Sequence, residues 1–232
     1  KESLFLLKNN EILFNQENLD LIPGNIYAYW ISTNSIENFK YPSIREELDC
    51  RVGLDTGDND KFLRLWYEVD YQSIKFDANS VEELHLEANK RYVPHTKGGS
   101  YRKWQGNLDY IIAFDKKNYD LLLESGNHLP SRHLYFKEGL TWTRVSSKFS
   151  VRYVPKGCVF NSACPTAFGE AKWFYYALGL LNSRTVEYYA ELLSPTINFQ
   201  AGDIGKIPFI KDELWREAVE KLVKENIILS ET

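Results

Sequence analysis

Alternation of apolar and polar residues predicts that the middle of the chain is rich in β-strands. Asp109–Phe114 and Leu134–Lys137 have the β-branched and aromatic content that is typical of strands. Gly139–Phe160 alternates along its length and predicts a β-meander, with Pro155-Lys156-Gly157 as a turn. Shorter strand candidates are Leu4–Lys8 and Glu11–Phe14 around a tight turn at Asn9-Asn10, Ile26–Ile31 after the turn Pro23-Gly24, Phe62–Val69, and Asp203–Phe209.

The spacing of apolar residues predicts helices toward the C-terminal end. In Lys172–Leu193 the apolar side chains fall on roughly one stripe at helical spacing, and Pro195 follows the segment. Asp212–Asn226 has the pattern of an amphipathic helix. Ser80–Ala88 is shorter and begins with a serine three residues before a glutamate, which is the spacing of a capping box. Ile36–Leu48 has a looser helical spacing that a proline interrupts.

Together these patterns predict one α+β domain, with a strand-rich mixed sheet in the middle and helices at the C-terminal end. Residues 1–210 are expected to form this domain and residues 211–232 a terminal amphipathic helix. The chain starts at Lys1 and contains no methionine among its 232 residues. We therefore expect a fragment of a longer polypeptide.

Composition excludes several classes of protein. Apolar residues make up 44% and charged residues 26% of the chain, which is typical of a globular domain. No apolar run is long enough to span a membrane, and the N-terminus does not have the pattern of a secretory signal. The three cysteines (Cys50, Cys158 and Cys164) include no Cys-x-x-Cys pair, which argues against a disulfide framework or a zinc knuckle. A reducing, cytoplasmic location is the expectation, with no membrane partner.

Charge is distributed in blocks along the chain. Residues 90–156 carry 13 Lys/Arg and 5 Asp/Glu, whereas residues 1–89 carry 8 and 17, and residues 157–232 carry 7 and 10. Phosphate attraction depends on local cations that displace counterions, so the total charge of -4 does not exclude a nucleic-acid partner. The alternative is that the acidic outer thirds pair with the basic block inside the fold.

The stretch Tyr92–Asn107 combines basic, aromatic and glycine residues. From Lys90 to Leu108 there are five Lys/Arg and no Asp or Glu. Cations, rings for base stacking and glycines that expose the backbone suit nucleic acid better than a membrane. A solvated basic loop with a few core aromatic residues is the alternative interpretation.

Motifs for catalysis are absent from the sequence. There is no GxGxxG or GxxxxGK[ST] loop for a nucleotide, no HExxH motif for a metal and no GxSxG elbow for a nucleophile. The four histidines (His85, His95, His128 and His133) are scattered. We therefore expect no catalytic, metal-binding or cofactor-binding residues in this chain.

Several longer segments resemble one family. They are Gly53–Arg64, Tyr92–Asn107, Tyr135–Ser147, Leu178–Ser183 and Leu193–Pro208. These segments resemble parts of large adenine-specific DNA methyltransferases, which include the PglX proteins of BREX phage-defence systems and the type IIG restriction–modification enzymes. The resemblance covers about residues 50–210. Residues 70–91 diverge most from the family pattern.

The resemblance implies a TaqI-like target-recognition region, which in that family follows the methyltransferase domain. The closing Gly-Asp-Ile-x-x-Ile-Pro pattern at residues 202–208 is similar to the end of recognition domains in type I specificity subunits. The [NDS]PP[YF] motif that holds a flipped adenine is absent, as is the glycine-rich loop that binds S-adenosylmethionine. The implied partners are double-stranded DNA and the methyltransferase domain of the same polypeptide. The parent would transfer a methyl group from S-adenosylmethionine to adenine N6 on a flipped base.

A recognition module needs phosphate contacts for position and base-edge contacts for specificity. The candidates for phosphate contacts are Lys97, Lys103, Lys137 and Lys148. Guanidinium groups bind either phosphate or the O6 and N7 atoms of guanine, so both roles are open for Arg102, Arg144 and Arg152. Gln105 and Asn107 have amides that suit the N6 and N7 atoms of adenine.

Three further features keep two interpretations each: the glycine pair Gly98-Gly99, Trp104 and an acidic loop. Gly98 and Gly99 would let backbone N–H groups approach phosphate, or they form only a hairpin turn. Trp104 is a further DNA-contact candidate, although core packing is the expected role for it and for Trp142. The acidic loop Gly53–Asp60 is expected to be a structural turn or a seam against the methyltransferase domain.

Two other functions remain open. The first is a protein-interaction module of the same defence system, which would present an exposed apolar or aromatic surface. The second is a nuclease, for which the sequence offers no PD…ExK-like spacing. A recognition module for duplex DNA is the preferred hypothesis.

Overall fold

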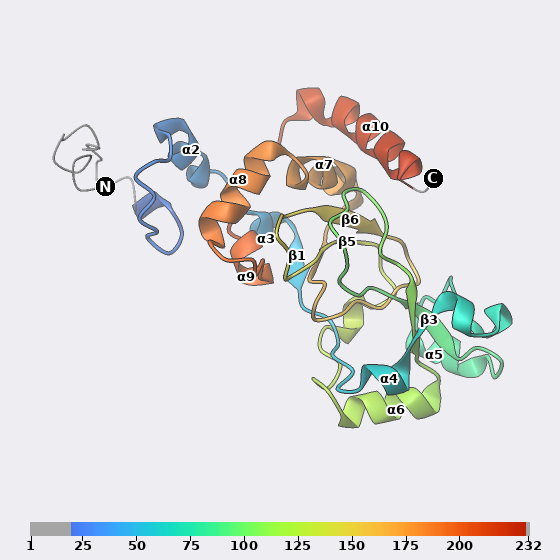
Figure 1. Ribbon diagram of the computed structural model, residues 1–232. Helices are drawn as coiled ribbons and strands as arrows, with labels where there is room; N and C mark the ends of the chain where they lie inside the picture. Colours follow the sequence, from blue (N-terminus) through green and yellow to red (C-terminus); the bar gives the residue numbers. More distant parts are fainter. Residues whose placement is uncertain (1–19, 231–232) are drawn as a thin grey trace.

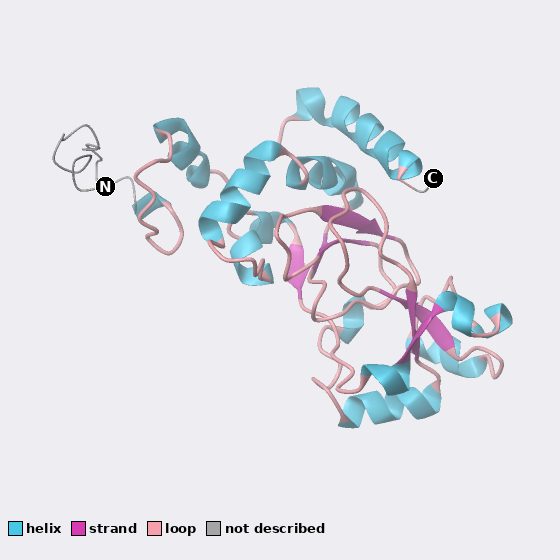
Figure 2. Cartoon of the chain, in the orientation of Figure 1, coloured by secondary structure: helices cyan, strands magenta, loops and turns pink. Residues whose placement is uncertain are grey.

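A computed structural model describes residues 20–230, in which the strands form two antiparallel sheets (Figures 1 and 2). The larger sheet has the order β1-β7-β5-β6 and the smaller sheet the order β2-β4-β3. The strands of the larger sheet are β1 (Asp49–Arg51), β5 (Gly139–Trp142), β6 (Val151–Val154) and β7 (Thr166–Phe168). Those of the smaller sheet are β2 (Leu63–Leu65), β3 (Tyr92–His95) and β4 (Tyr110–Ala113). The α+β class is therefore confirmed, but two antiparallel sheets replace the single mixed sheet that the pattern predicted.

The larger sheet packs against the C-terminal helices, which gather on one side of it in Figure 1. These helices are α7 (Ala171–Leu181), α8 (Arg184–Leu193), α9 (Ala201–Ile204) and α10 (Glu213–Leu229). Every residue of β5 is buried, since this strand is central in the sheet and is covered on both faces. Trp142 at its end is fully buried, and its indole N–H donates to the carbonyl of Phe199 at 2.8 Å. The core position expected for this tryptophan is confirmed.

The smaller sheet is built from chain that leaves the larger sheet after β1 and returns to it at β5. Its strands are flanked by α4 (Asn59–Phe62), α5 (Val81–Leu86) and α6 (Lys116–Glu124), and three short 3-10 helices, η3 (Trp66–Glu68), η4 (Tyr71–Ser73) and η5 (Arg132–Leu134), complete this part. A second buried cluster fills it, with Phe114 near the centre of a group of edge-to-face aromatic rings. The two sheets meet at a backbone hydrogen bond, in which Thr96 N donates to Val159 O at 3.0 Å.

The N-terminal described elements are α2 (Thr33–Glu37), η2 (Asn38–Lys40) and α3 (Ile44–Glu47). The loose helical pattern at Ile36–Leu48 is thus interrupted at Pro42, as expected, because proline has no N–H to continue a helix. The predicted strand at Ile26–Ile31 is wrong: tight turns bond Ile31 N to Ala28 O at 3.1 Å. The predicted hairpin at residues 4–14 lies outside the described residues.

The segment Lys172–Leu193 forms two helices instead of the one predicted. The break falls at Asn182 and Ser183. The Asn182 side chain bonds both backbone groups of Val151, accepting at 3.0 Å and donating at 2.8 Å, and Ser183 Oγ accepts from the backbone of Val186 as the cap of α8. A contact between a helix end and a strand therefore overrides the continuous apolar stripe.

Two further strand predictions are wrong. At Leu134–Lys137 the chain leaves η5 and turns, with Phe136 at a φ of 67°, which is incompatible with a strand. At Asp203–Phe209 the chain instead completes α9, which begins at Ala201. Both segments have buried apolar residues, and burial alone does not distinguish a strand from a turn.

Predictions that rest on local chemistry are confirmed. Ser80 Oγ accepts from Glu83 N at 3.1 Å and begins α5, although the Glu83 carboxylate accepts from the backbone of Asn79. Strand β4 and helix α10 form as predicted, and Asp212 caps α10. No helix within residues 20–230 combines the length and apolarity that crossing a membrane requires.

Candidate functional site

The loop of residues 96–109, called the 96–109 loop below, connects β3 to β4 but lies over the larger sheet. Trp104 N donates to Val151 O at 3.0 Å, and Tyr153 N donates to Trp104 O at 2.7 Å. These bonds attach the loop to β6. In Figure 1 the loop, in green, extends past β5 and β6 toward α7 and α10. The basic and aromatic stretch is therefore held against a second structural unit.

The backbone of this loop is strained at its tip. Trp104 has a φ of 72°, Gly106 of 123° and Asn107 of 58°. Positive φ is rare for a bulky residue such as tryptophan, and strained residues concentrate at binding and catalytic sites. The two bonds of Trp104 to β6, and a bond from Asn107 Nδ2 to Ser100 O at 2.9 Å, hold this conformation. The tip is thus fixed in one shape.

The glycines of the loop serve close packing. A Cβ at Gly99 would lie 2.9 Å from the Asn107 amide, closer than a methyl group tolerates. Gly98 lies beside Thr143, where a Cβ would be 3.4 Å from the Thr143 methyl group. Gly99 is exposed to solvent and Gly98 is half-buried.

A second loop, residues 143–150 between β5 and β6, lies beside the first and is called the 143–150 loop below. Thr143 contacts the first loop at Gly98. At Tyr101, burial raises the pKa of the phenol, the Glu187 charge raises it further, and the nearby Lys148 lowers it. Lys148 is exposed and Arg144 is half-buried. Two cationic loops that are distant in sequence therefore become neighbours.

Most cations of the basic block have no carboxylate partner. Of the 13 Lys/Arg in residues 90–156, only Arg91 and Lys116 form ion pairs, and both partners lie within the block itself. Across residues 20–230, no ion pair joins this block to the acidic outer thirds. The acidic outer thirds therefore do not neutralise the block through direct ion pairs in the described part of the chain, although Glu187 of the C-terminal third and Lys148 both act on Tyr101.

Three predicted site residues of the loop have partners inside the molecule. Lys103 Nζ donates to the carbonyl of Asn182 at 2.7 Å. Lys97 Nζ lies 4.5 Å from the centre of the Tyr110 ring. Trp104 is half-buried and lines an apolar hollow of about 370 Å³ with residues of α7 and α10. Trp104 therefore packs on the core at least in part, as expected.

Arg152 is buried, and this removes it from the candidates for a DNA contact. Its side chain is 1% exposed, and its guanidinium donates to Thr143 Oγ1 at 3.2 Å. Nε and Nη1 have no partner in the described part of the chain. Burial lowers its pKa from the ordinary value, and Cys164 beside it opposes that effect. The sequence pattern misplaced it because arginine is almost never fully buried, even on an edge strand such as β6.

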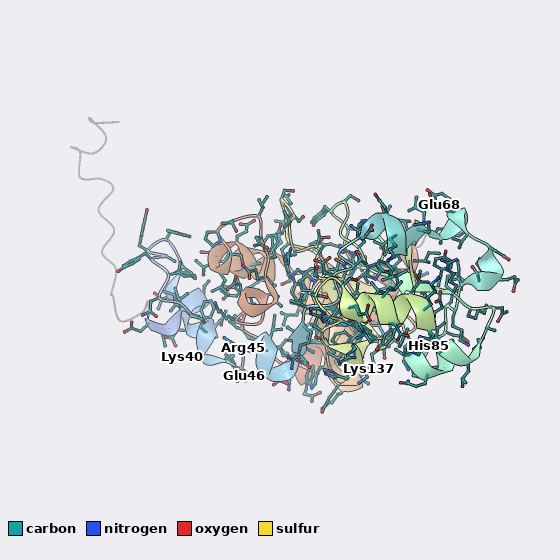
Figure 3. All side chains as sticks on the ribbon, turned by 90° about the horizontal axis from the view of Figure 1, so that it is seen from below. Lys40, Arg45, Glu46, Glu68, His85 and Lys137 are labelled. Atoms are coloured by element: carbon teal, nitrogen blue, oxygen red, sulfur yellow. The ribbon has the colours of Figure 1, made fainter. Side chains whose placement is uncertain are left out.

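Lys137 lies apart from the two loops. It is exposed and lines a hollow of about 440 Å³ together with residues of α5 and α6 such as Val81 and Tyr119. Figure 3, viewed from below, shows Lys137 beside α6 on the side of the smaller sheet. The structure does not bring this lysine together with the other predicted phosphate contacts.

The tip of the 96–109 loop encloses a polar hollow of about 410 Å³. Predicted candidates Arg102, Gln105 and Asn107 line it. Asp109 and Ser230 line it as well, and sequence reasoning identified neither. Asp109 is the first acidic residue after the stretch from Lys90 to Leu108 that lacks Asp and Glu. The charge count therefore already marked its position.

The acidic loop Gly53–Asp60 packs as a structural turn. Asp55 N donates to Asn127 Oδ1 at 2.7 Å, and Asn127 Nδ2 donates to Gly53 O at 3.0 Å. Gly57 in this turn and Gly126 opposite have φ values of 70° and 57°, which favour glycine. A Cβ at Gly126 would overlap the carbonyl of Asp55. These contacts account for the glycines of the turn.

His95 ends β3 beneath the 96–109 loop and is fully buried. Asn161 Nδ2 lies 3.1 Å from His95 Nε2. Burial, opposed by a backbone hydrogen bond and aided by the Lys97 charge, lowers the pKa of His95 from 6.5 to about 3. Within residues 20–230, no group of three His, Cys, Asp or Glu side chains is arranged to hold a metal ion.

The depressed pKa of His95 predicts a pH-dependent stability. Between pH 6.5 and pH 3 the unfolded chain binds a proton that the folded chain does not, so stability falls as pH falls through this window. We expect about 1.4 kcal/mol less stability at pH 5.5 than at pH 7.5 from this group. Urea unfolding of the wild type and of His95→Gln at both pH values measures it. An equal pH effect in both proteins would contradict the assignment.

No family model matches the chain. The chain is 34% identical over 209 residues, 84% of its length, to the adenine-specific methyltransferase PglX of Lacticaseibacillus casei (strain Zhang). It is 37% identical over 215 residues, 90% of its length, to the adenine-specific methyltransferase BrxX of Escherichia coli O9:H4 (strain HS). The chain spans 17% of the length of each of these relatives.

Proposed function

We propose that this chain, which is homologous to a segment of the PglX and BrxX adenine-specific methyltransferases, is the DNA target-recognition module of a longer methyltransferase. The module binds duplex DNA and selects its sequence. The methyltransferase domain of the same polypeptide extrudes the target adenine and methylates its N6. In a phage-defence or restriction system, such a module determines which DNA carries the methyl mark.

The main support for the proposal is that two adjacent loops carry cations that lack carboxylate partners. Lys97 and Arg102 come from the 96–109 loop, and Arg144 and Lys148 from the 143–150 loop. None of these four side chains forms an ion pair within residues 20–230. Unpaired cations on neighbouring loops attract a polyanion and release its counterions on binding.

The roles divide by exposure and position. Lys148 is exposed, and with half-buried Lys97 and Arg144 it supplies phosphate contacts. Arg102 and the fixed tip at residues 104–107 supply base contacts, because a rigid backbone keeps side chains in register with base edges. Lys103 and Arg152 support the loops from inside and do not touch DNA.

The methyl donor belongs to the remainder of the longer polypeptide. The chain has no glycine-rich loop for S-adenosylmethionine and no [NDS]PP[YF] motif for the flipped adenine. The residues present therefore do not fit the cofactor, and no chemical step is assigned to them.

Salt dependence tests this function. The chain is expected to bind duplex DNA with an affinity that falls steeply with salt, with log K against log[salt] having a slope of about -2.7 to -3.6 for three or four phosphate contacts. Fluorescence anisotropy of a labelled duplex at several salt concentrations measures the slope. Absence of binding at low salt, or binding that salt does not change, would refute the proposal.

A second candidate function is docking to protein, and an apolar stripe along one flank of α10, at the rim of the hollow that Leu222 shares with Trp104, favours it. Large apolar side chains recur there at seven-residue intervals and are 58–71% exposed: Trp215, Leu222 and Leu229. A monomeric protein rarely leaves such a stripe in water. Since the relatives are much longer than this chain, the methyltransferase domain of the same polypeptide is the partner that we propose for this face.

A further inference from the structure

We infer that the polar hollow at the tip of the 96–109 loop reads one G·C base pair in the major groove, with Arg102 on the guanine and Asp109 on the cytosine. The inference rests on the proposed function and specifies a part of it. It assigns a reading role to Asp109, a carboxylate in a loop that otherwise attracts phosphate.

Two opposite charges line this hollow without pairing. Arg102 and Asp109 are both exposed, and both contribute to the wall of the hollow. Neither takes part in an ion pair in the described part of the chain. The hollow of about 410 Å³ between Arg102 and Asp109 leaves room for a ligand. Such a ligand would offer an acceptor to the arginine and a donor to the aspartate.

Both side chains start from fixed backbone. A Cβ at Gly106 would lie 2.8 Å from Arg102 Cδ and 2.9 Å from its Nη1, so the arginine lies directly over this glycine. Asp109 immediately precedes β4, and its carbonyl accepts from Trp66 N at 3.0 Å. Asn107, between them, has a positive φ and bonds Ser100 O. The backbone from which the two side chains extend is therefore held in place before any ligand arrives.

The chemistry of base edges selects the ligand. In the major groove guanine offers two acceptors, O6 and N7, which match the fork of a guanidinium. Its partner cytosine offers the N4 amino group, which donates to a carboxylate. Next to DNA a carboxylate is repelled by every phosphate, so Asp109 is favourable only where it accepts from a base amino group. One G·C pair satisfies Arg102 and Asp109 together.

Selection from a pool of randomised duplexes tests the inference with the 232-residue chain. The wild type is compared with Asp109→Asn and Arg102→Gln, and Glu124→Gln serves as the control because this exposed carboxylate lies on α6, away from the loop. We expect both loop variants to lose preference for G·C at the same single position, by about 5- to 150-fold. Glu124→Gln keeps the wild-type preference. Thermal unfolding verifies that the variants fold.

Several results would overturn the inference. They are loss of preference at two different positions, loss at an A·T pair, or an unchanged preference in either loop variant. A uniform gain of affinity in Asp109→Asn for all duplexes means that the carboxylate only repels phosphate. Wild-type binding that is salt-dependent but unselective refutes this inference alone, whereas no duplex binding at all refutes the proposed function with it.

Discussion

Replacing Lys97, Arg144 and Lys148 together with alanine is expected to lower the affinity of the chain for duplex DNA by about 100-fold at moderate salt. These cations lie on the two neighbouring loops and lack carboxylate partners within residues 20–230. Each lost phosphate contact also removes one released counterion. The slope of log K against log[salt] is therefore expected to become shallower by about 2.7. Anisotropy titrations across a salt series measure both quantities.

A matched control separates local contacts from total charge. Replacing Lys117, Arg132 and Lys156 with alanine removes the same charge from exposed positions that also lack ion pairs in the described structure. We expect less than a fivefold loss of affinity from this control, because screening limits the effect of charges farther than about 8–10 Å from the DNA. Equal losses in the two triple variants would show that only net charge matters, and would refute the two-loop interface.

Trp142→Ala is expected to lower the free energy of unfolding by about 3–5 kcal/mol. The side chain is 0% exposed, packs near Phe149 and donates to Phe199 O. Its removal leaves a large cavity between the sheet and the C-terminal segments, and it leaves a buried carbonyl without its donor. Urea denaturation with an unchanged m-value measures the loss.

Trp215→Ala is the control, because it removes a side chain of the same size from an exposed position. Trp215 is 60% exposed on α10, so its removal creates no internal cavity. We expect this variant to change stability by less than about 1 kcal/mol. If Trp215→Ala destabilised the chain as much as Trp142→Ala, burial would not explain the effect, and α10 would have to contribute to the core in a way that its exposure does not indicate.

The cations of the basic block show how much of the candidate site can be predicted from the sequence. The charge count located the cationic segment, and the structure confirms that its cations remain largely unpaired in the described residues. The count treated Arg152 and Lys137 like the other cations. Arg152 is buried because of the order of the strands, and Lys137 lies apart from the other cations because the smaller sheet is inserted between β1 and β5. No local pattern encodes either arrangement.

Helix ends show the same limit. Ser80 begins α5 as predicted, because the hydroxyl and the amide that it accepts from are three residues apart. The break between α7 and α8 depends on Asn182 binding Val151, a residue 31 positions away. The pattern of apolar residues is the same on both sides of this break, so periodicity predicts one helix where tertiary contacts make two.

By itself the sequence determined the α+β class, the cap of α5, the terminal helix and the position of the cationic stretch, since each depends on residues within a few positions of one another. Only the tertiary structure decided that the 96–109 loop lies over β6, that Arg152 is buried, and that Asp109 lies in the same hollow as Arg102. Those outcomes depend on which distant segments pack together, and that choice is made by the burial of whole faces rather than by any single stretch of chain.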